Sequence, residues 1–334
     1  MHIEIKPYDP KYQESVIEVL QHLWPWNEQE RRKRFDWEYF GNPSHPMPLA
    51  VVAVNEQDEV LGFRGWVPGI VCSDGKKYLV ARAADAVVSP QCRRQSVFSK
   101  MTVFSIEYLR KNGIDAILNL TSNSQSNPGN LKLGWAPIGQ LNIWYRLVIS
   151  FKKKRLSEVD RIRKGKYQIE ITPYIPRGLQ FNYQESRIAF SMNEGQLDWY
   201  SKFPRVNFIT VVAYDSNGKT AGILIFKKSN NTKKTVLFFL NVKEGSLAKI
   251  MFKVAKRYLP TGLISVWGMA LNEDKVNILK SFGFFKIPFY EKLRKMPPIL
   301  VRSMNNSEVH EGWLLGGKDI RDLNNWELMP IDMF

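Results

Sequence analysis

A strand-helix-strand segment in the first half of the chain constrains the fold most. Residues 78–89 form a β-branched and small-residue run, residues 97–111 carry an amphipathic helical pattern, and residues 114–120 are a second apolar run. Gly113 ends the helix and returns the chain to the second strand. A strand, a helix and a strand in this order form a βαβ unit, whose two strands lie parallel in one sheet. The sequence therefore predicts an α/β fold.

The rest of the first half adds elements on both sides of this unit. Apolar periodicity and turn residues predict a first strand, two helices, a β-hairpin and a late short helix before Gly134-Trp135. Their ranges are residues 2–6, 11–23, 28–40, 49–54 with 60–71, and 130–133.

The second half of the chain repeats this order, which indicates two related domains. Asp36-Trp37 has a counterpart in Asp198-Trp199, and Gly134 has one in Gly283. Only residues 243–245 separate the strand and helix that correspond to the βαβ unit, so the second copy lacks the long loop of the first. We predict a domain over residues 1–150, a basic linker over 151–179, and a degenerate domain with a C-terminal extension over 180–334. Each domain is expected to be a mixed twisted sheet flanked by helices.

The balance of charge favours anionic partners. The chain has 48 Lys and Arg against 32 Asp and Glu, a net charge of +16, while 44% of its 334 residues are hydrophobic. Such a hydrophobic share is enough for folded cores and excludes a disordered chain. The excess charge suits nucleic acid, an anionic membrane surface, or small polyanions. Part of it lies in residues 152–166, a run that is also typical of a solvated linker.

Cysteine, histidine and hydropathy patterns indicate a cytoplasmic protein without a metal. The two cysteines, Cys72 and Cys92, give no disulfide framework, and the four histidines are scattered without ligand spacing. The first residues show no export signal, and no apolar run is long enough to span a bilayer.

The turn between residues 89 and 99 is the segment most suited to bind an anion. Backbone amides at the start of a helix have no intrahelical partner, and the helix dipole adds partial positive charge. Arg93 and Arg94 add two full charges beside these amides. This arrangement suits a pyrophosphate, although a structural turn with solvated arginines has the same pattern.

In this turn and in the order of elements around it, residues 1–150 resemble the GNAT superfamily of N-acetyltransferases. The family motif Q/R-x-x-G-x-G/A aligns with Arg93 at its first position, and Ser96 and Phe98 replace the two glycines. The resemblance implies that an acyl-coenzyme A, with an acetyl or a longer or hydroxylated acyl group, is the cosubstrate. It places the pantetheine arm on Val87 and Val88. The residues expected around the phosphates are Arg93, Arg94, Gln95, Ser96, Val97, Phe98 and Ser99.

Residues 127–135 resemble the short family helix that borders the coenzyme. The alignment puts Asn130 where a tyrosine often protonates the departing thiolate, and an asparagine cannot do so. Water can take that role, because the thiol of coenzyme A is acidic enough. Asn127 and Asn130 are predicted donor contacts, with helix capping as the alternative.

Asp85 is the predicted catalytic residue. It lies among alanines and valines in the long strand, where an unpaired carboxylate would be costly. A carboxylate acting as a base would free the lone pair of an acceptor amine for attack on the thioester. The alternative is a structural ion pair with Arg64 or Arg82.

Trp24, Trp26 and Asn27 are the predicted acceptor-binding residues. They lie between the first two helices, a connection that borders the acceptor pocket in the superfamily. Aromatic faces there suit a sugar ring or a nucleobase, although a packed loop is an equally simple explanation.

The first-half pattern is also similar to sugar-modifying enzymes of bacterial surface polysaccharide pathways, including lipopolysaccharide biosynthesis. This similarity implies a dTDP- or UDP-linked amino-dideoxysugar as the acceptor. Separately, we expect a monomer or a small homo-oligomer. Two alternatives stay open: transfer to a peptide or lipid-linked amine, and a basic nucleic-acid-binding protein with a vestigial acyltransferase fold. The sequence contains no known nucleic-acid-binding motif, so we do not expect nucleic acid as the partner.

Overall fold

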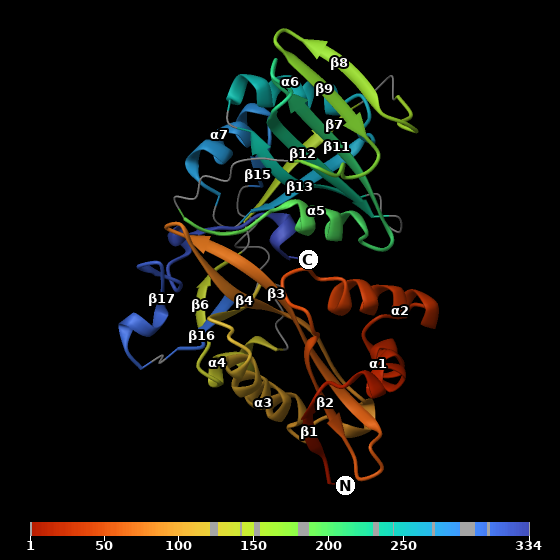
Figure 1. The fold of residues 1–334 in the computed structure, drawn as a ribbon, viewed down its shortest axis with the longest axis vertical. Helices are drawn as coiled ribbons and strands as arrows, with labels where there is room; N and C mark the ends of the chain where they lie inside the picture. The colour runs from red at the N-terminus through yellow and green to blue at the C-terminus, as the bar shows by residue number, and fades with distance from the viewer. Residues whose placement is uncertain are drawn as a thin grey trace. The chain divides into compact units, whose positions relative to one another are not determined.

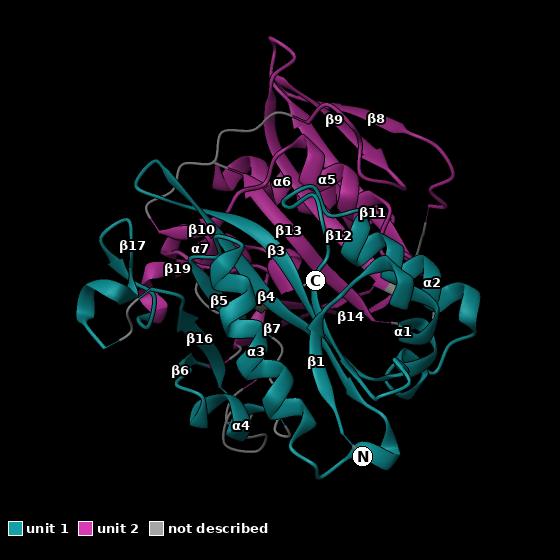
Figure 2. Cartoon of the chain, turned by 60° about the horizontal axis from the view of Figure 1, so that its bottom comes forward, with its two compact units in different colours: residues 1–139, 297–322 teal, residues 140–296, 323–334 magenta. Residues whose placement is uncertain are grey.

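Two mixed β-sheets flanked by helices organise this protein (Figure 1). The computed structural model describes residues 2–120, 126–140, 142–149, 154–179, 187–229, 234–242, 244–268, 271–287, 298–305 and 308–333. The chain divides into two compact units (Figure 2). Unit 1 comprises Met1–Gly139 and Pro297–Asp322, and unit 2 comprises Gln140–Met296 and Leu323–Phe334.

The sheet of unit 1 has the strand order β1-β2-β3-β4-β5-β16-β6. Neighbouring strands are antiparallel except β4 and β5, which are parallel as the βαβ pattern predicts. The strands are β1 (Glu4–Pro7), β2 (Leu49–Val54), β3 (Val60–Ser73), β4 (Lys76–Val88), β5 (Ala116–Asn119), β6 (Ala136–Gly139) and β16 (Ile299–Ser303). The small strands β17 (Leu314–Leu315) and β18 (Lys318–Asp319) pair separately.

Helices cover both faces of this sheet (Figure 1). Alternate residues of β2 point to opposite faces, so Ala50 and Val52 pack under α1 and α2 while Val51 and Ala53 pack under α3. The helical segments are η1 (Pro10–Tyr12), α1 (Gln13–Val19), η2 (Leu20–His22), α2 (Glu28–Phe35), the π-helical η3 (Asp36–Phe40), η4 (Pro90–Cys92), α3 (Val97–Lys111), α4 (Asn127–Lys132) and η5 (His310–Trp313).

Unit 2 contains the second sheet, in the order β15-β7-β14-β13-β12-β11-β9-β8. Its strands are β7 (Asn142–Val148), β8 (Asp160–Lys164), β9 (Tyr167–Thr172), β11 (Val206–Tyr214), β12 (Thr220–Ser229), β13 (Thr235–Val242), β14 (Gly262–Gly268) and β15 (Phe285–Lys286). Its helices are α5 (Glu194–Ser201), α6 (Gly245–Ala255), α7 (Glu273–Ser281), η6 (Leu323–Asn325) and η7 (Pro330–Met333). Strands β10 (Ile188–Phe190) and β19 (Trp326–Glu327) pair in parallel.

The order of elements from β11 to β15 matches that from β2 to β6, so the predicted repeat is a structural repeat. In unit 2, β13, α6 and β14 correspond to β4, α3 and β5, and β13 again pairs in parallel with β14. Only two residues separate β13 from α6, whereas eight residues separate β4 from α3. The second copy therefore lacks the long loop.

The borders of the units differ from the predicted boundaries because each sheet contains a strand from outside its own half of the sequence. Strand β7, expected in the first domain, pairs with β14 and β15 in unit 2. Strand β16, expected in the second, lies between β5 and β6 in unit 1. Residues 151–179, expected as a linker, include β8 and β9. Each inserted strand satisfies the backbone groups of a strand that would otherwise end its sheet.

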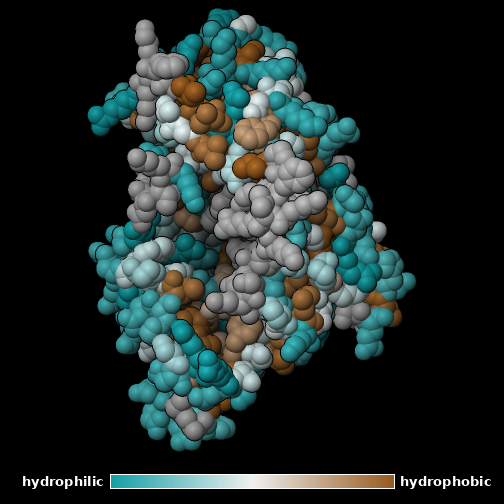
Figure 3. All heavy atoms as spheres, turned by 180° about the vertical axis from the view of Figure 1, so that it is seen from behind, coloured by the Kyte–Doolittle hydropathy of each residue, from teal (hydrophilic) through white to brown (hydrophobic). Residues whose placement is uncertain are grey.

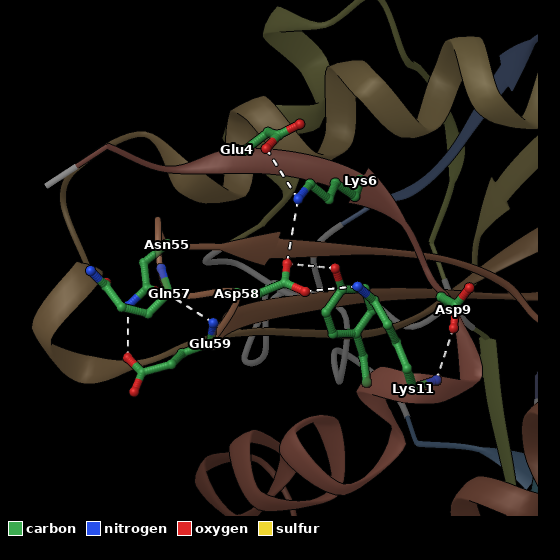
Figure 4. Close-up of polar contacts among 9 residues, drawn as sticks. Glu4, Lys6, Asp9, Lys11, Asn55, Gln57, Asp58 and Glu59 are labelled. Carbon is green, nitrogen blue, oxygen red and sulfur yellow. Dashed lines mark hydrogen bonds and ion pairs between the residues drawn. The ribbon is translucent and has the colours of Figure 1, made fainter.

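Hydrogen bonds and ion pairs connect the turn between β2 and β3 to the N-terminal segment of unit 1 (Figure 4). Asp58 adopts a positive φ of 60°. Its carboxylate accepts hydrogen bonds from Lys11 Nζ at 2.7 Å and Tyr12 Oη at 2.7 Å, and it lies 3.3 Å from Lys6 Nζ. These bonds hold the pKa of Asp58 low, at about 2. Because the side chains are exposed, this network orients the hairpin and contributes little stability.

Some large apolar side chains stay exposed in unit 2, where Leu147 of β7 pairs with Leu263 of β14. On the face seen in Figure 3, brown apolar groups lie between larger teal hydrophilic areas. In the described part of the chain, no helix is long and apolar enough to cross a membrane.

The inserted strand β16 predicts that a late residue stabilises the N-terminal core. Leu300 is fully buried with Trp66, Ile117 and Trp135. We expect Leu300→Ala to lower the free energy of unfolding by about 2–5 kcal/mol, since it leaves a cavity, as measured by urea denaturation. Leu131→Ala, at an exposed position on α4, is the control and should change it by less than about 0.5 kcal/mol. Equal effects of the two substitutions would contradict the packing of β16.

Candidate functional site

The parallel strands β4 and β5 separate before β4 ends. Their pairing runs from Val80 opposite Ala116 to Arg82 opposite Leu118. Strand β4 continues to Val88, still paired with β3 on its other side. Among the described residues, no strand pairs with the β5-facing edge of β4 after Arg82. This edge offers backbone hydrogen-bonding groups to an extended ligand.

A β-bulge in β4 lies within this unpaired stretch. Arg64 of β3 is opposite Ala86 and Trp66 is opposite Ala83, so one residue of β3 faces two residues of β4, Ala84 and Asp85. A bulge of this kind bends the strand and re-aims the side chains beside it. Strand β4 therefore changes direction where the predicted catalytic residue lies.

Gly65, the residue opposite the bulge, makes room for Tyr39. A Cβ atom at Gly65 would lie 2.0 Å from the hydroxyl oxygen of Tyr39, which is too close for any side chain. The Tyr39 hydroxyl donates a hydrogen bond of 2.9 Å to Asp85 Oδ2. A glycine is therefore required at this position for tyrosine and aspartate to meet.

Asp85 is 8% exposed and its surroundings favour the protonated form. Burial is the main cause that raises the pKa of Asp85, to about 7, and the nearby charge of Glu38 adds to the rise. Arg34 and hydrogen bonds from Tyr39 and Trp24 act in the opposite direction. A carboxyl group with a pKa of about 7 can accept and release a proton near neutral pH.

The π-helical segment η3 supplies the groups around Asp85. It buries three consecutive side chains, Trp37, Glu38 and Tyr39, which an α-helical surface pattern would not do. Glu38 accepts a hydrogen bond of 2.9 Å from Arg34 Nε. Burial also raises the pKa of Tyr39 well above its usual value, so this phenol stays protonated as a hydrogen-bond donor.

The predicted acceptor residues lie partly beside Asp85. Trp24 is buried and hydrogen-bonds Asp85, and Trp26 stacks on it with ring centroids 5.7 Å apart. The Arg34 guanidinium lies over both rings, at 5.0 and 5.8 Å. Asn27 caps α2, because its Oδ1 accepts a hydrogen bond from the amide of Glu30 at 2.9 Å.

The predicted anion-binding turn joins β4 to α3. The first backbone hydrogen bond of α3 runs from Lys100 N to Ser96 O, and no side chain of the described residues caps the helix. The amides of residues 97–99 therefore lack an intrahelical acceptor. Arg94 and Ser96 have positive φ angles of 63° and 59°. Ser96 thus holds a backbone conformation that favours glycine, at a cost of about 1–2 kcal/mol.

A pocket of about 340 Å³ lies at this turn. Its lining residues are Val88, Cys92, Arg93, Arg94, Ser96, Val97 and Phe98. The side chains of Arg93, Arg94, Gln95 and Ser99 are exposed, and Arg93 Nε donates a hydrogen bond of 3.4 Å to Val88 O. Val87, by contrast, packs in the core under α1 and α2, so only its main chain can contact a ligand at the strand edge.

Phe98, one of the residues that line this pocket, lies near α4 and near Arg64. The ring of Phe98 lies 3.5 Å from the place of a Cβ on Gly129 in α4. The guanidinium of Arg64 lies 5.4 Å from the Phe98 ring and 4.5 Å from that of Trp66. Burial lowers the pKa of Arg64 to about 10, so this buried side chain is still charged at neutral pH.

The two asparagines of α4 differ in their environments. Asn127 accepts a hydrogen bond from Asn119 Nδ2 at 3.1 Å and donates one of 2.7 Å to Pro298 O, which ties α4 to β5. Asn130 is fully buried, and its Oδ1 and Nδ2 have no hydrogen-bond partner among the residues that the structure describes. Neither residue is the N-cap of α4, which is Ser126.

Sequence patterns missed three residues of the site, namely Glu38, Tyr39 and Arg64. The signal for the first two was the acidic and aromatic segment of residues 36–40, which a regular helix would have partly exposed. The signal for Arg64 was a lone charge within the apolar run of residues 60–71. The alternative of a structural ion pair of Asp85 with Arg64 or Arg82 stays a prediction; among the described residues, Arg64 Nε and Nη2 have no hydrogen-bond partner. Among the described residues, no group of His, Cys, Asp or Glu could hold a metal ion.

Comparison of this geometry with solved structures shows the fold. A conserved protein of unknown function from Enterococcus faecalis V583, described as a "Probable N-Acyltransferase", is similar with a TM-score of 0.63 at 12% identity, over 91% of this chain and 73% of that one. A tandem GNAT protein from the clavulanic acid biosynthesis pathway is similar with a TM-score of 0.50 at 11% identity, over 92% and 100% of the two chains. The chain has the tandem GNAT fold.

The same fold occurs in Saccharomyces cerevisiae N-myristoyltransferase with bound myristoyl-CoA, with a TM-score of 0.51 at 11% identity, over 90% of this chain and 80% of that one. No family model matches this chain, and no curated protein matches its sequence. The predicted fold class, two tandem GNAT-like α/β domains, is therefore confirmed by structure.

The environment of Asp85 predicts a measurable titration. Because the Tyr39 hydroxyl donates to the carboxylate, it stabilises the charged form, and Tyr39→Phe should raise the pKa of Asp85 further above about 7. Carbon-13 NMR of the labelled carboxyl group across pH 4–10 would measure both values. Tyr12→Phe, which removes a hydrogen bond to the exposed Asp58, is the control and should leave the Asp85 titration unchanged. A wild-type value near 4 would contradict this description of the site.

Proposed function

We propose that this chain is an N-acyltransferase that moves an acyl group from an acyl-coenzyme A to an amine. The observation that carries the proposal is the juxtaposition of a buried carboxyl group of pKa about 7 with an unpaired strand edge that leads to uncapped helix amides. The carboxyl group suits proton removal from an amine. The strand edge and the helix amides suit a long ligand with phosphates at one end.

The donor half of the proposal uses the pocket at the start of α3. Uncapped amides, the helix dipole and the exposed Arg93 and Arg94 together favour a diphosphate. From there, an extended pantetheine arm can pair with the main chain of Val87 and Val88. Such an arm would end beside the bulge at Ala84 and Asp85.

The acceptor half depends on Asp85. An amine is mostly protonated near pH 7, and its nitrogen must lose a proton before it can attack the thioester carbonyl. Asp85 in its charged form takes this proton, directly or through water. The nitrogen then forms the new C–N bond, the C–S bond breaks, and the thiolate leaves. Asn130 has no acidic proton to give, so water protonates the thiolate.

For the acceptor, we propose a nucleotide-linked amino-dideoxysugar, dTDP- or UDP-linked, of a surface polysaccharide pathway. The stacked Trp24 and Trp26 and the Arg34 guanidinium over them offer aromatic and positively charged contacts near Asp85. These contacts suit a sugar or base ring that carries phosphate groups. The net charge of +16 also favours an anionic acceptor and donor.

The proposed activity is tested by thiol release. Purified protein, an acyl-coenzyme A and a panel of dTDP- and UDP-linked amino sugars should release free coenzyme A, as detected with a thiol reagent. Peptide and lipid-linked amines in the same assay would identify the other acceptor classes. If isothermal titration calorimetry detected no binding of any acyl-coenzyme A thioester, the proposal would be wrong.

Asp85→Asn should lower kcat by about 10²–10⁴-fold, since the amide cannot take a proton. In the wild type, turnover should rise with pH through about 7 as Asp85 loses its proton, and this rise should be absent from the variant. The matched control is Asp58→Asn, at an exposed carboxylate on the β2–β3 turn, which should keep wild-type turnover. Equal turnover of Asp85→Asn and wild type would exclude Asp85 as the base.

The same variant gives a check on folding. A carboxyl whose pKa is raised in the folded state makes the protein less stable as pH rises from about 4 to about 7, because the folded form binds the extra proton. Asp85→Asn should therefore gain thermal stability relative to wild type as the pH is raised over this range. A loss of activity caused by unfolding would show the opposite trend at pH 8.

The double variant Arg93→Ala, Arg94→Ala should weaken binding of acetyl-coenzyme A by about 10–100-fold, because the two exposed guanidinium groups, which solvent screens, together contribute about 1.4–2.7 kcal/mol. The loss should be larger at low ionic strength. Lys111→Ala, an exposed cation at the other end of α3, is the control and should leave the affinity unchanged. Titration calorimetry at two salt concentrations measures both.

A further inference from the structure

Buried polar atoms without a hydrogen-bond partner gather in one part of unit 1. Within the described part of the chain, six such atoms have no partner: Arg64 Nε and Nη2, the indole nitrogens of Trp66 and Trp135, and both amide atoms of Asn130. Folded proteins seldom leave such atoms unpaired, because each costs about 1–3 kcal/mol. A concentration of them therefore marks a place where a ligand can supply the missing bonds.

These four residues form one series of contacts. The Arg64 guanidinium lies 4.5 Å from the Trp66 ring, and Trp66 stacks on Trp135 with centroids 6.2 Å apart. The amide of Trp135 donates to Asn130 O at 3.3 Å. Phe98 completes the group, since its ring faces Arg64 and also lines the pocket at the start of α3. The unpaired atoms are thus close to the proposed donor site.

The two unpaired atoms of Arg64 have a defined geometry. Nε and Nη2 point their N–H groups to the same side of the planar guanidinium and form the fork that binds both oxygens of a carboxylate. Arg64 is 3% exposed, so solvent does not satisfy this fork. A buried charge without a partner is costly and is retained where a ligand neutralises it.

The nearby carboxylate of Asp85 does not occupy this fork. It influences the charge of Arg64 through space, but its hydrogen-bond donors are Tyr39 and Trp24 on the α1–α2 face. Arg64 contacts Phe98 of α3, on the other face of the sheet. Arg64 and its fork therefore belong to the side of the sheet that carries α3 and the proposed donor pocket.

The position of Arg64 along the strands indicates which part of the donor it meets. It lies opposite Ala86, whereas the pocket at the start of α3 begins at Val88. Two residues of a strand span about 6.6 Å, so Arg64 lies deeper than the phosphate-binding turn. In the proposed function, the reactive end of the donor lies there. The phosphates already have the amides of α3 and the exposed Arg93 and Arg94.

We propose that Arg64 binds a carboxylate at the far end of the transferred acyl group, so that the donor is the coenzyme A thioester of a dicarboxylic acid. Asn130 and the indole N–H groups of Trp66 and Trp135 would bind the carbonyl and carboxylate oxygens of the same group. This inference rests on the proposed function and specifies the class of acyl donor.

The test compares two donors of equal carbon number. Succinyl-coenzyme A and butyryl-coenzyme A both carry four-carbon acyl groups and the same phosphates, and only the first has a carboxylate. Titration calorimetry should show that the wild type binds succinyl-coenzyme A at least about 10-fold more tightly, because a hydrogen bond to a charged group contributes about 1.5–3 kcal/mol. Arg64→Met, of similar length and without charge, should remove this preference. Arg64→Lys, which keeps the charge without the fork, should retain part of it.

Each outcome distinguishes this inference from the proposed function. Equal affinity of the wild type for both thioesters, or a preference that persists in Arg64→Met, overturns the inference and leaves the acyltransferase proposal standing. A similar loss of both affinities in Arg64→Met means that Arg64 serves the phosphates, which also overturns it. Binding of neither thioester by the wild type removes both. Circular dichroism and the melting temperature of Arg64→Met establish that the variant is folded, as expected when an unpaired buried charge is replaced by an apolar side chain.

Discussion

The extra residue in β4 opposite Gly65 sets the geometry of the candidate site. Because β4 bulges at Ala84 and Asp85, its direction changes beside the stretch where it has parted from β5. Gly65 leaves the space that the Tyr39 hydroxyl fills, and this hydroxyl fixes the Asp85 carboxyl. If β3 and β4 paired without the bulge, the space for the Tyr39 hydroxyl beside Gly65 and the bend in β4 would both be lost.

Two buried groups of opposite charge lie at this bulge and face opposite sides of the sheet. Asp85 is surrounded by groups from η3 and from the α1–α2 connection, while Arg64 faces α3. Burying charges costs several kcal/mol each, so a fold keeps them where they are paired or used. Asp85 responds by taking a proton near neutral pH, whereas Arg64 stays charged with its fork unsatisfied. The first behaviour suits a base, and the second suits a binding group for an anion.

The turn that we propose to bind phosphate keeps a backbone conformation that usually requires glycine. Ser96 has a positive φ although a glycine would hold it without strain, and the start of α3 stays uncapped. Phe98, in place of the second motif glycine, lines the pocket and lies near Arg64 and Gly129. In unit 2, only two residues separate β13 from α6, so the described part of that unit has no loop of comparable length there. This difference supports the proposed donor site in unit 1.

The sequence by itself determined the local elements and the chemistry of single segments. The helix predicted over residues 97–111 is α3, the repeat of the two halves is real, and the tandem GNAT-like fold class is confirmed. These features follow from periodicity and turn residues, which act over a few neighbours along the chain. Only the tertiary structure decided which strands complete each sheet, since β7 and β16 pair with strands more than 100 residues away in sequence. It also decided that Tyr39 and Trp24 hydrogen-bond Asp85, and that Arg64 Nε and Nη2 have no hydrogen-bond partner among the described residues. Burial and hydrogen-bond partners depend on contacts that no local pattern specifies.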